Sequence, residues 1–365
     1  MNLQSPRAWR ERRQRRRDTL EVAPAPVSAR APLGIGVAVL VIVVVVSTAI
    51  GPADLSIATV MSVLASHVPF VHAHTSANAI DQAIVWQIRL PRVVLAGLVG
   101  SMLALGGASY QGVFRNPLAD PYLLGVAAGA GLGATFAIVT PSISTTLLPI
   151  AAFAGGVAAV MLTYLIGVRA GHSSAGSSII LAGVAVAAIF TAIQTNVQQQ
   201  HAADLQPVYS WILGSLTVAT WSDVRLIVPY VVLSSVVLLT HRRLLDVLRV
   251  GEDEARALGV NPQRVRLTVV AAATLGTAAA VSVSGLIGFV GIIVPHVVRL
   301  TTNASYRVVL PVSLVVGASF LILADLGARM LDAPAEVPLG VVTAFIGGPF
   351  FIFVLRSRRS HQGVL

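Results

Sequence analysis

Apolar stretches of 15 to 22 residues recur along almost the whole chain. They cover residues 33–51, 91–112, 123–140, 149–168, 178–198, 222–240, 267–284, 286–300, 308–328 and 337–355. An α-helix crosses a bilayer core of about 30 Å with about 20 apolar residues, so this pattern predicts an all-α integral membrane protein with ten transmembrane helices. Only 11% of the 365 residues are charged, against roughly 25% in an ordinary soluble domain, which leaves little room for a separate soluble domain.

The placement of arginine predicts the orientation, because short loops rich in basic residues stay in the cytosol. With the N-terminus inside, 21 of the 25 arginines are cytosolic and only Arg89, Arg92, Arg225 and Arg329 lie outside. We therefore expect a disordered arginine-rich cytosolic tail at 1–32, a membrane domain at 33–356 and a cytosolic C-terminal tail at 357–365. A secretory or twin-arginine signal is the alternative for the N-terminus, but the apolar run from Leu33 to Ile50 is long for a signal core.

Two residue types are missing, and both absences limit the chemistry. The chain has no cysteine, which excludes disulfides and thiolate metal sites. It also has no lysine, so a phosphate-binding loop of the form GxxxxGK[ST] cannot exist. Any ATP and magnesium must therefore bind to another chain, and we expect neither catalytic residues nor a metal or cofactor on this one.

Small residues crowd several apolar stretches, as in GSMLALGGASYQG, GVAAGAGLGA and GLIGFVG. Helices in lipid gain contact by close backbone approach at such residues, so we interpret them as packing positions. The GAGLGA run lacks the GxGxxG spacing of a nucleotide site and follows no predicted strand.

The polar stretch RNPLADPYLLGV, residues 115–126, falls at the cytosolic end of the second apolar segment. Pro117 and Pro121 disfavour helix at the residues before them, and Asn116 and Asp120 can bond the backbone groups released, so a sharp turn is expected. An Asn-Pro-Ala box of the water-channel type is the alternative, but those boxes come in pairs and no second copy is present.

The longest cytosolic connection is residues 241–266, here named the coupling segment. Its GEDEARALGV run predicts a short helix from Glu252 to Leu258 that ends at Gly259, with Ala255 and Leu258 on one face. Such a helix suits docking into a groove of another protein, and a solvated loop helix is the equal alternative.

Arg89 and Arg92 open the second apolar segment, and Arg329 follows Asp325 by one helical turn, so those last two can pair. These three arginines, the arginine cluster, either anchor helices at the interface or receive carboxylates of an external partner.

A second polar feature is the loop histidines His67, His72 and His74, which raise a metal or haem hypothesis, although no acidic residue lies among them. The sequence does not decide whether these histidines or His201 touch a substrate.

Eight ordered motifs between residues 80 and 355 resemble the FecCD-type permeases of bacterial ABC importers for iron-siderophores, haem and cobalamin. They are VWQIRLPR, QGVFRNPLADPYLLGV, ILAGVAV, YSWILGSL, GEDEARALGV, GLIGFVGIIVPHVVRL, LADLGAR and AEVPLGVVTAFIGGPFF. The resemblance implies a type II ABC importer permease fold that homodimerises in the bacterial inner membrane. It implies two ATPase subunits inside, a periplasmic or lipid-anchored substrate-binding protein outside, and no nucleic-acid partner.

The resemblance also assigns roles to residues. It implies that Arg89, Arg92 and Arg329 receive glutamates of the binding protein. The ATPase contact that it implies comprises Asp246, Gly251, Glu252, Asp253, Glu254, Ala255, Arg256, Leu258 and Gly259. Asn116 and Leu118 match positions that narrow the cytosolic end of the pathway, and Ser177 matches the serine of a second gate, a Thr-Ser pair in the cobalamin permease. Gly176 stands where that pair has its threonine, so the match to the second gate is partial.

The function implied is translocation of a ferric siderophore, with haem or cobalamin as alternatives within the family. From another class, a proton-coupled secondary transporter is disfavoured because few ionisable residues lie within the spans. A membrane scaffold without transport would leave the ordered gate and docking motifs unexplained.

Overall fold

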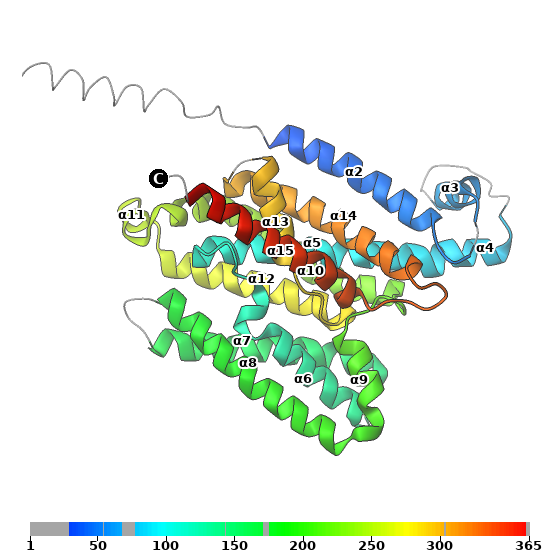
Figure 1. Ribbon diagram of the computed structural model, residues 1–365, viewed down its shortest axis with the longest axis horizontal. Coiled ribbons are helices and arrows are strands. Elements are labelled where there is room, and N and C mark those ends of the chain that lie inside the picture. Colours follow the sequence, from blue (N-terminus) through cyan, green and yellow to red (C-terminus); the bar gives the residue numbers. More distant parts are fainter. Residues whose placement is uncertain are drawn as a thin grey trace, which may run out of the picture.

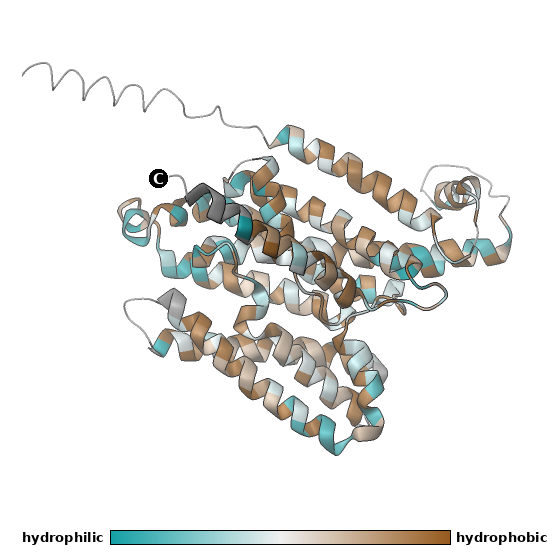
Figure 2. Ribbon diagram, viewed as in Figure 1, coloured by the Kyte–Doolittle hydropathy of each residue, from teal (hydrophilic) through white to brown (hydrophobic). Residues whose placement is uncertain are grey.

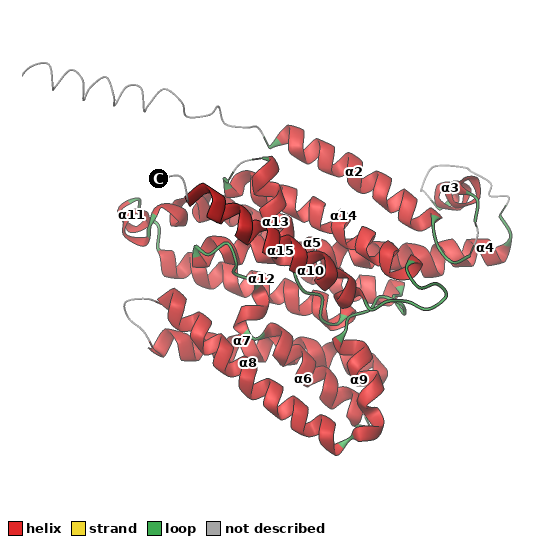
Figure 3. Cartoon of the chain, in the orientation of Figure 1, coloured by secondary structure: helices red, strands yellow, loops and turns green. Residues whose placement is uncertain are grey.

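The computed structural model describes residues 29–53, 55–67, 77–142, 144–170, 175–302 and 304–362. Over these residues the chain consists of helices and short connections, without a β-strand (Figure 3). The long helices are α2 (Arg30–Ala49), α5 (Leu90–Phe114), α7 (Leu148–Ala170), α8 (Ala175–Gln200), α10 (Trp221–Val250), α12 (Pro262–Ser284), α14 (Tyr306–Met330) and α15 (Leu339–Gln362). The shorter ones are α3 (Ile57–Ser66), α4 (Ala79–Ala83), α6 (Val126–Val139), α9 (Leu205–Ile212), α11 (Glu252–Ala257) and α13 (Val290–Thr301).

Every one of the ten predicted apolar segments contains a helix. Within the described residues, seven helical stretches are long and apolar enough to cross a membrane, judged by length and composition. The other three predicted segments correspond to apolar helical stretches of 10 to 17 residues, which are Val126–Val139, Val290–Thr301 and, within α15, Leu339–Val354. The count of ten crossings therefore remains a prediction. Most of the predicted N-terminal tail, His72, His74 and the last three residues lie outside the described part of the chain.

The second span begins earlier than the sequence indicates, because the helix does not start at Pro91. Ala79 to Phe114 form one continuous helical stretch that includes a turn of π-helix, η1 (Ile84–Arg89). Leu90 N–H donates to Val85 O across this wider turn. Arg89 therefore lies in the π-turn and Arg92 in the first turn of α5, within a helical stretch that begins at Ala79.

Helix α5 forms the centre of the bundle and packs against α10, α12, α13 and α14. Two of its glycines permit this closeness. A Cβ atom on Gly100 would lie 2.3 Å from Gly317 O of α14, and one on Gly107 would lie 2.1 Å from Gly291 O of α13. The small residues of this helix therefore serve close packing, as predicted.

A second group, α6, α7 and α8, lies beside this central bundle (Figure 1). Most helices run along the longest axis, so the molecule has two ends, one with α3 and α4 and the other with α11. We name them the α4 end and the α11 end. Hydrophilic residues gather at both, whereas α2 and α14 are largely hydrophobic along their length (Figure 2). Helix α2 exposes Ile35, Val41 and Ile42, as expected of a lipid-facing surface.

Candidate functional site

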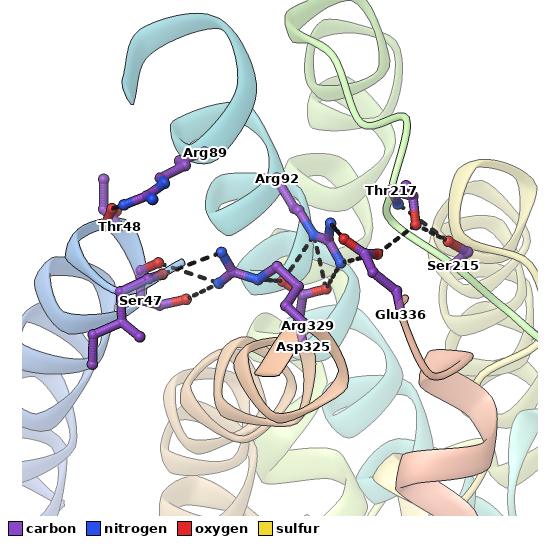
Figure 4. Close-up of polar contacts among 10 residues, drawn as sticks. Ser47, Thr48, Arg89, Arg92, Ser215, Thr217, Asp325, Arg329 and Glu336 are labelled. Atoms are coloured by element: carbon purple, nitrogen blue, oxygen red, sulfur yellow. Dashed lines mark hydrogen bonds and ion pairs between the residues drawn. The ribbon is translucent and has the colours of Figure 1, made fainter. Parts of the chain in front are cut away.

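An ion-pair network at the α4 end joins α5, α14 and the segment before α15 (Figure 4). Arg92 Nη2 lies 2.9 Å from Asp325 Oδ1, and Arg92 Nη1 lies 2.8 Å from Glu336 Oε1. Arg329 Nε lies 3.2 Å from Asp325 Oδ2, which confirms the predicted pairing of Asp325 with Arg329. The Asp325 side chain is 1% exposed and lies between two guanidinium groups.

Arginines also fasten the end of α2 to this network. Arg89 Nη1 donates to Thr48 O at 3.0 Å and to Ala49 O at 2.6 Å. Arg329 Nη2 donates to Ser47 O at 3.2 Å and to Ser47 Oγ at 2.7 Å. The last carbonyls of a helix lack intrahelical donors, so these guanidiniums supply the missing partners.

The arginine cluster is buried in this chain. Arg89, Arg92 and Arg329 are 4%, 7% and 3% exposed, and each has partners within the protein. The structure thus brings Arg92 and Arg329 to one carboxylate, while Arg89 turns toward α2 (Figure 4). Their contact with an external partner remains a prediction. Asp325, predicted as a partner of Arg329, serves both arginines.

Glu336 and Thr217 belong to the site, and sequence reasoning missed both. The Glu336 side chain is 26% exposed, and Thr217 Oγ1 donates to its Oε2 at 2.7 Å. Burial opposes ionisation of Glu336, but hydrogen bonds from Arg92 and Thr217 hold its pKa below the ordinary 4.5. The signal available in the sequence was a lone carboxylate in the AEVPLG motif, and no spacing rule connects it to Arg92.

Backbone hydrogen bonds tie the start of α15 to the segment after α9. Leu339 N donates to Gly214 O at 2.9 Å, and Gly340 N donates to Leu213 O at 3.0 Å. A pocket of about 470 Å³ opens beside these bonds. Its lining is apolar: Ile212, Leu213, Leu286, Gly340, Val341, Ala344, Phe345 and Pro349. The start of α15 therefore lies between Glu336 of the ion-pair network and this pocket, which is here named the apolar recess.

The turn predicted at RNPLADPYLLGV is present at the α11 end. Helix α5 ends at Phe114, and Arg115 adopts a left-handed conformation with φ of 50°. Asn116 Oδ1 accepts from Leu118 N, and Asp120 Oδ1 accepts from Tyr122 N, both at 2.9 Å. The polar side chains thus bond the released backbone groups, as predicted, and a 3-10 turn, η2 (Pro121–Leu124), leads into α6.

The proposed gate residues differ in their placement. Leu118 is 44% exposed and helps to line a cavity of about 50 Å³ with Pro117, Ile292, His296, Phe350, Phe351 and Val354. Asn116 is used within the turn and does not line this cavity. Ser177 lies in the first turn of α8, but its side chain is outside the described part of the structure. The structure therefore connects Leu118, and not Asn116, to this cavity.

The coupling segment forms the predicted helix, α11, preceded by Gly251 and followed at Gly259 by a φ of 77°. Glu252 pairs with Arg266 on α12 and, at 3.3 Å, with Arg256. Arg256 also pairs with Asp253 at 2.6 Å. The pair with Arg266 fixes the orientation of α11 on the helix that follows it.

The predicted apolar face of this helix is wrong. Ala255 is fully buried, whereas Leu258 is 69% exposed. Leu258 N still donates to Glu254 O, but three residues turn a helix by about 300°, so the Leu258 side chain lies about 60° away from that of Ala255. Asp253 is exposed as well, so Leu258 and Asp253 both face outward.

The Asp246 carboxylate is hydrogen-bonded to another helix of the same chain. It accepts from Ser305 Oγ at 2.8 Å and from Tyr306 N at 2.7 Å, so it caps the start of α14 and links α10 to that helix.

The described histidines have local partners. The ring of His67 stacks on Trp86 with 3.8 Å between ring centroids, and its Nδ1 lies 2.9 Å from Val63 O. His201 Nδ1 lies 2.9 Å from Val197 O. In the part of the chain that the structure describes, no three His, Cys, Asp or Glu side chains gather as a metal site would require.

The FecCD transport family matches residues 39–357, so the chain belongs to that family. The cobalamin import system permease protein BtuC of Halobacterium salinarum is 44% identical over 277 residues, which are 76% of this chain and 74% of that protein. The hemin transport system permease protein HmuU of Yersinia pestis is 38% identical, covering 80% of this chain and 88% of that protein. The Fe(3+) dicitrate transport system permease protein FecD of Escherichia coli is 36% identical, over 76% of this chain and 86% of that protein.

The fold also matches a solved structure described as an inward-facing conformation of a metal-chelate type ABC transporter. The TM-score is 0.78 at 31% identity, and the match covers 89% of this chain and 98% of the other. Together with its apolar helices, these matches define a multi-pass membrane permease of the ABC importer class.

Proposed function

We propose that the chain is the permease subunit of an importer that translocates a ferric siderophore across the cytoplasmic membrane of a bacterium. The observation that carries this proposal is a family match along nearly the whole membrane domain in a chain that cannot form a lysine-bearing phosphate loop. A separate ATPase must then supply the energy. Iron-chelate and hemin permeases among the relatives support a metal chelate as cargo.

Cobalamin is the second candidate cargo. The cobalamin permease of Halobacterium salinarum shares 44% of aligned residues with this chain, more than the hemin or dicitrate permeases named above.

The translocation path runs along α15 in this proposal. Residues of α15 line both the 470 Å³ pocket, through Phe345 and Pro349, and the 50 Å³ cavity, through Phe350 and Val354. Two copies of the chain, each with ten crossings, enclose this path between them. Leu118 forms its cytosolic gate together with Ser177, and Asn116 contributes to the gate by holding the turn that carries Leu118. Apolar, weakly binding walls suit a bulky chelate, because conduction requires that no site retain the cargo tightly.

The coupling segment contacts the ATPase, with the α11 end and both termini in the cytosol. Leu258 and Asp253 point away from the bundle, which supports a contact with another protein. The fixed link from Glu252 to Arg266 carries motion of α11 to α12, and Asp246 carries motion of α10 to α14.

The α4 end faces the periplasm in this proposal, and the arginine cluster receives carboxylates of a substrate-binding protein. Arg92 supports this role because its guanidinium already holds a partly exposed carboxylate in bidentate geometry.

Uptake into vesicles tests the cargo. Vesicles containing the permease and its ATPase, supplied with internal ATP, receive the binding protein loaded with ferric siderophore, haem or cobalamin. We expect the fastest accumulation for the siderophore. Faster accumulation of cobalamin or haem would reassign the cargo within the family, and no accumulation of any of the three would contradict the proposed function.

A further inference from the structure

We propose that Glu336 is a releasable latch: its carboxylate holds the α4 end closed, and a carboxylate of the docking protein takes its place on Arg92. This inference rests on the proposed function, since it assumes that an external protein docks at the arginine cluster.

The two carboxylates that bind Arg92 differ in accessibility. Asp325 is 1% exposed, lies within α14 and also pairs with Arg329. Glu336 is 26% exposed and lies on the connection between α14 and α15. Exchange at Arg92 therefore requires loss of the Glu336 contact and leaves the buried pair with Asp325 intact.

The geometry of the Glu336 contact is the one that a partner's carboxylate would adopt. Arg92 Nη1 donates to Glu336 Oε1 at 2.8 Å, and Arg92 Nη2 donates to Glu336 Oε2 at 2.9 Å. A planar guanidinium fork recognises any carboxylate presented in this way. Glu336 thus occupies the position that an incoming glutamate or aspartate needs.

The charge of the network favours replacement. Three guanidiniums, those of Arg89, Arg92 and Arg329, lie at this end with two carboxylates, those of Asp325 and Glu336. Withdrawal of Glu336 leaves Arg92 with a single, shared carboxylate. An external carboxylate restores the bidentate pair, so docking and release of Glu336 favour each other.

Release also affects the apolar recess. Glu336 Oε2 accepts from Thr217, and a few residues further along, Leu339 and Gly340 bond to Gly214 and Leu213. Leu213 and Gly340 line the 470 Å³ pocket. The latch therefore restrains two segments that border the pocket, and its release lets them separate.

The test uses the complete transporter with its ATPase and four variants. Arg92→Gln removes the guanidinium to which the partner's carboxylate would bind. Glu336→Gln removes the charge from the latch. Thr217→Val removes the second anchor but keeps the Arg92 pair. Asp332→Asn is the control, because it removes one carboxylate from the same connection, where Asp332 is exposed. We expect Glu336→Gln to tighten binding of the substrate-binding protein by roughly three- to tenfold, Thr217→Val to tighten it less, and Asp332→Asn to leave it unchanged.

Movement of the two segments is measured in the same variants. The chain has no cysteine, so Val218→Cys and Leu331→Cys can be spin-labelled on the purified chain, before the ATPase and the binding protein are added, without labelling any other position. Both positions are exposed, at 86% and 71%. We expect the distance between the labels to lengthen when the binding protein docks, and Glu336→Gln to produce the longer distance without it.

The outcomes separate the latch from the docking role. If Arg92→Gln weakens docking while Glu336→Gln changes neither affinity nor label distance, the latch is wrong and docking stands. If neither Arg92→Gln nor Glu336→Gln affects affinity, docking at this cluster is itself wrong. Should Glu336→Gln fail to fold, Thr217→Val decides the matter, because an unchanged label distance in that variant overturns the latch.

Discussion

Arg92 on α5 and Asp325 on α14 lie 233 positions apart in the chain, yet their side chains form a buried pair in which Arg92 Nε and Nη2 both donate to Asp325 Oδ1, at 3.0 and 2.9 Å. This pair joins the central helix to α14 at the α4 end. Because Arg329 shares the same carboxylate, the pair also reaches α2.

Replacing Asp325 by Asn should destabilise the protein strongly. The change leaves the buried guanidinium of Arg329 without a carboxylate and leaves Arg92 with Glu336 alone, and breaking a buried ion pair in this way costs about 3–5 kcal/mol. We expect a large fall in the thermal unfolding temperature of the detergent-solubilised chain, with Asp332→Asn as the control. An Asp325→Asn chain as stable as the control would show that the ion-pair network does not stabilise the fold.

Gln111 should be needed in part because of Pro295, in addition to accepting a hydrogen bond from Arg299 through its Oε1. Proline has no N–H, so Gly291 O lacks its donor within α13, and Gln111 Nε2 supplies one at 2.9 Å. Gln111→Ala leaves this carbonyl unsatisfied, at a cost of about 1–3 kcal/mol. Pro295→Ala restores the N–H, so we expect Gln111→Ala to cost less in that background. Equal costs in the two backgrounds, measured by thermal unfolding, would contradict the assignment.

Leu258→Ser should weaken association with the ATPase by roughly tenfold, as expected when an exposed apolar contact near the centre of an interface is removed. Leu331→Ser is the matched control, since Leu331 is equally exposed but lies at the α4 end. Association is measured by co-purification and titration. Equal effects of the two substitutions would remove Leu258 from the interface.

Stability should depend on the ionisation of Asp120 in the turn before α6. Burial raises the pKa of Asp120 from 3.8 to about 6, although the N–H of Tyr122 donates to it. A raised carboxyl pKa favours the protonated folded state, so stability is highest below about pH 4 and falls as pH rises through about 6. The difference between 3.8 and about 6 corresponds to a loss of roughly 3 kcal/mol.

Asp120→Asn keeps an oxygen acceptor for Tyr122 and should flatten this part of the pH profile. Unfolding temperatures measured between pH 4 and pH 7 provide the comparison. An Asn variant that keeps the wild-type slope would assign the dependence to another group.

Local features were predictable from the sequence. The turn at residues 115–126, the short helix after Gly251 and the pairing of Asp325 with Arg329 depend on neighbours within a few positions, where proline, glycine and helical spacing act directly. The π-helical entry to α5 was not predictable, because no residue pattern distinguishes it from an ordinary helical turn.

Contacts between residues far apart in the sequence could not be predicted, for a different reason. The contacts of Arg92 with Glu336 and of Gln111 with Gly291 bring together residues from separate helices, and their geometry follows from packing rather than from local pattern. Arginines predicted to face a partner were therefore found buried among internal acceptors.

The central claim is that this chain provides a path and that ATP hydrolysis on a second protein provides the energy. The most direct test places the purified chain in vesicles with the loaded binding protein and compares cargo uptake with and without the ATPase and internal ATP, in the presence of an uncoupler. Accumulation that requires the ATPase and ATP and persists with the uncoupler is predicted. Uphill accumulation by the chain alone would contradict the account.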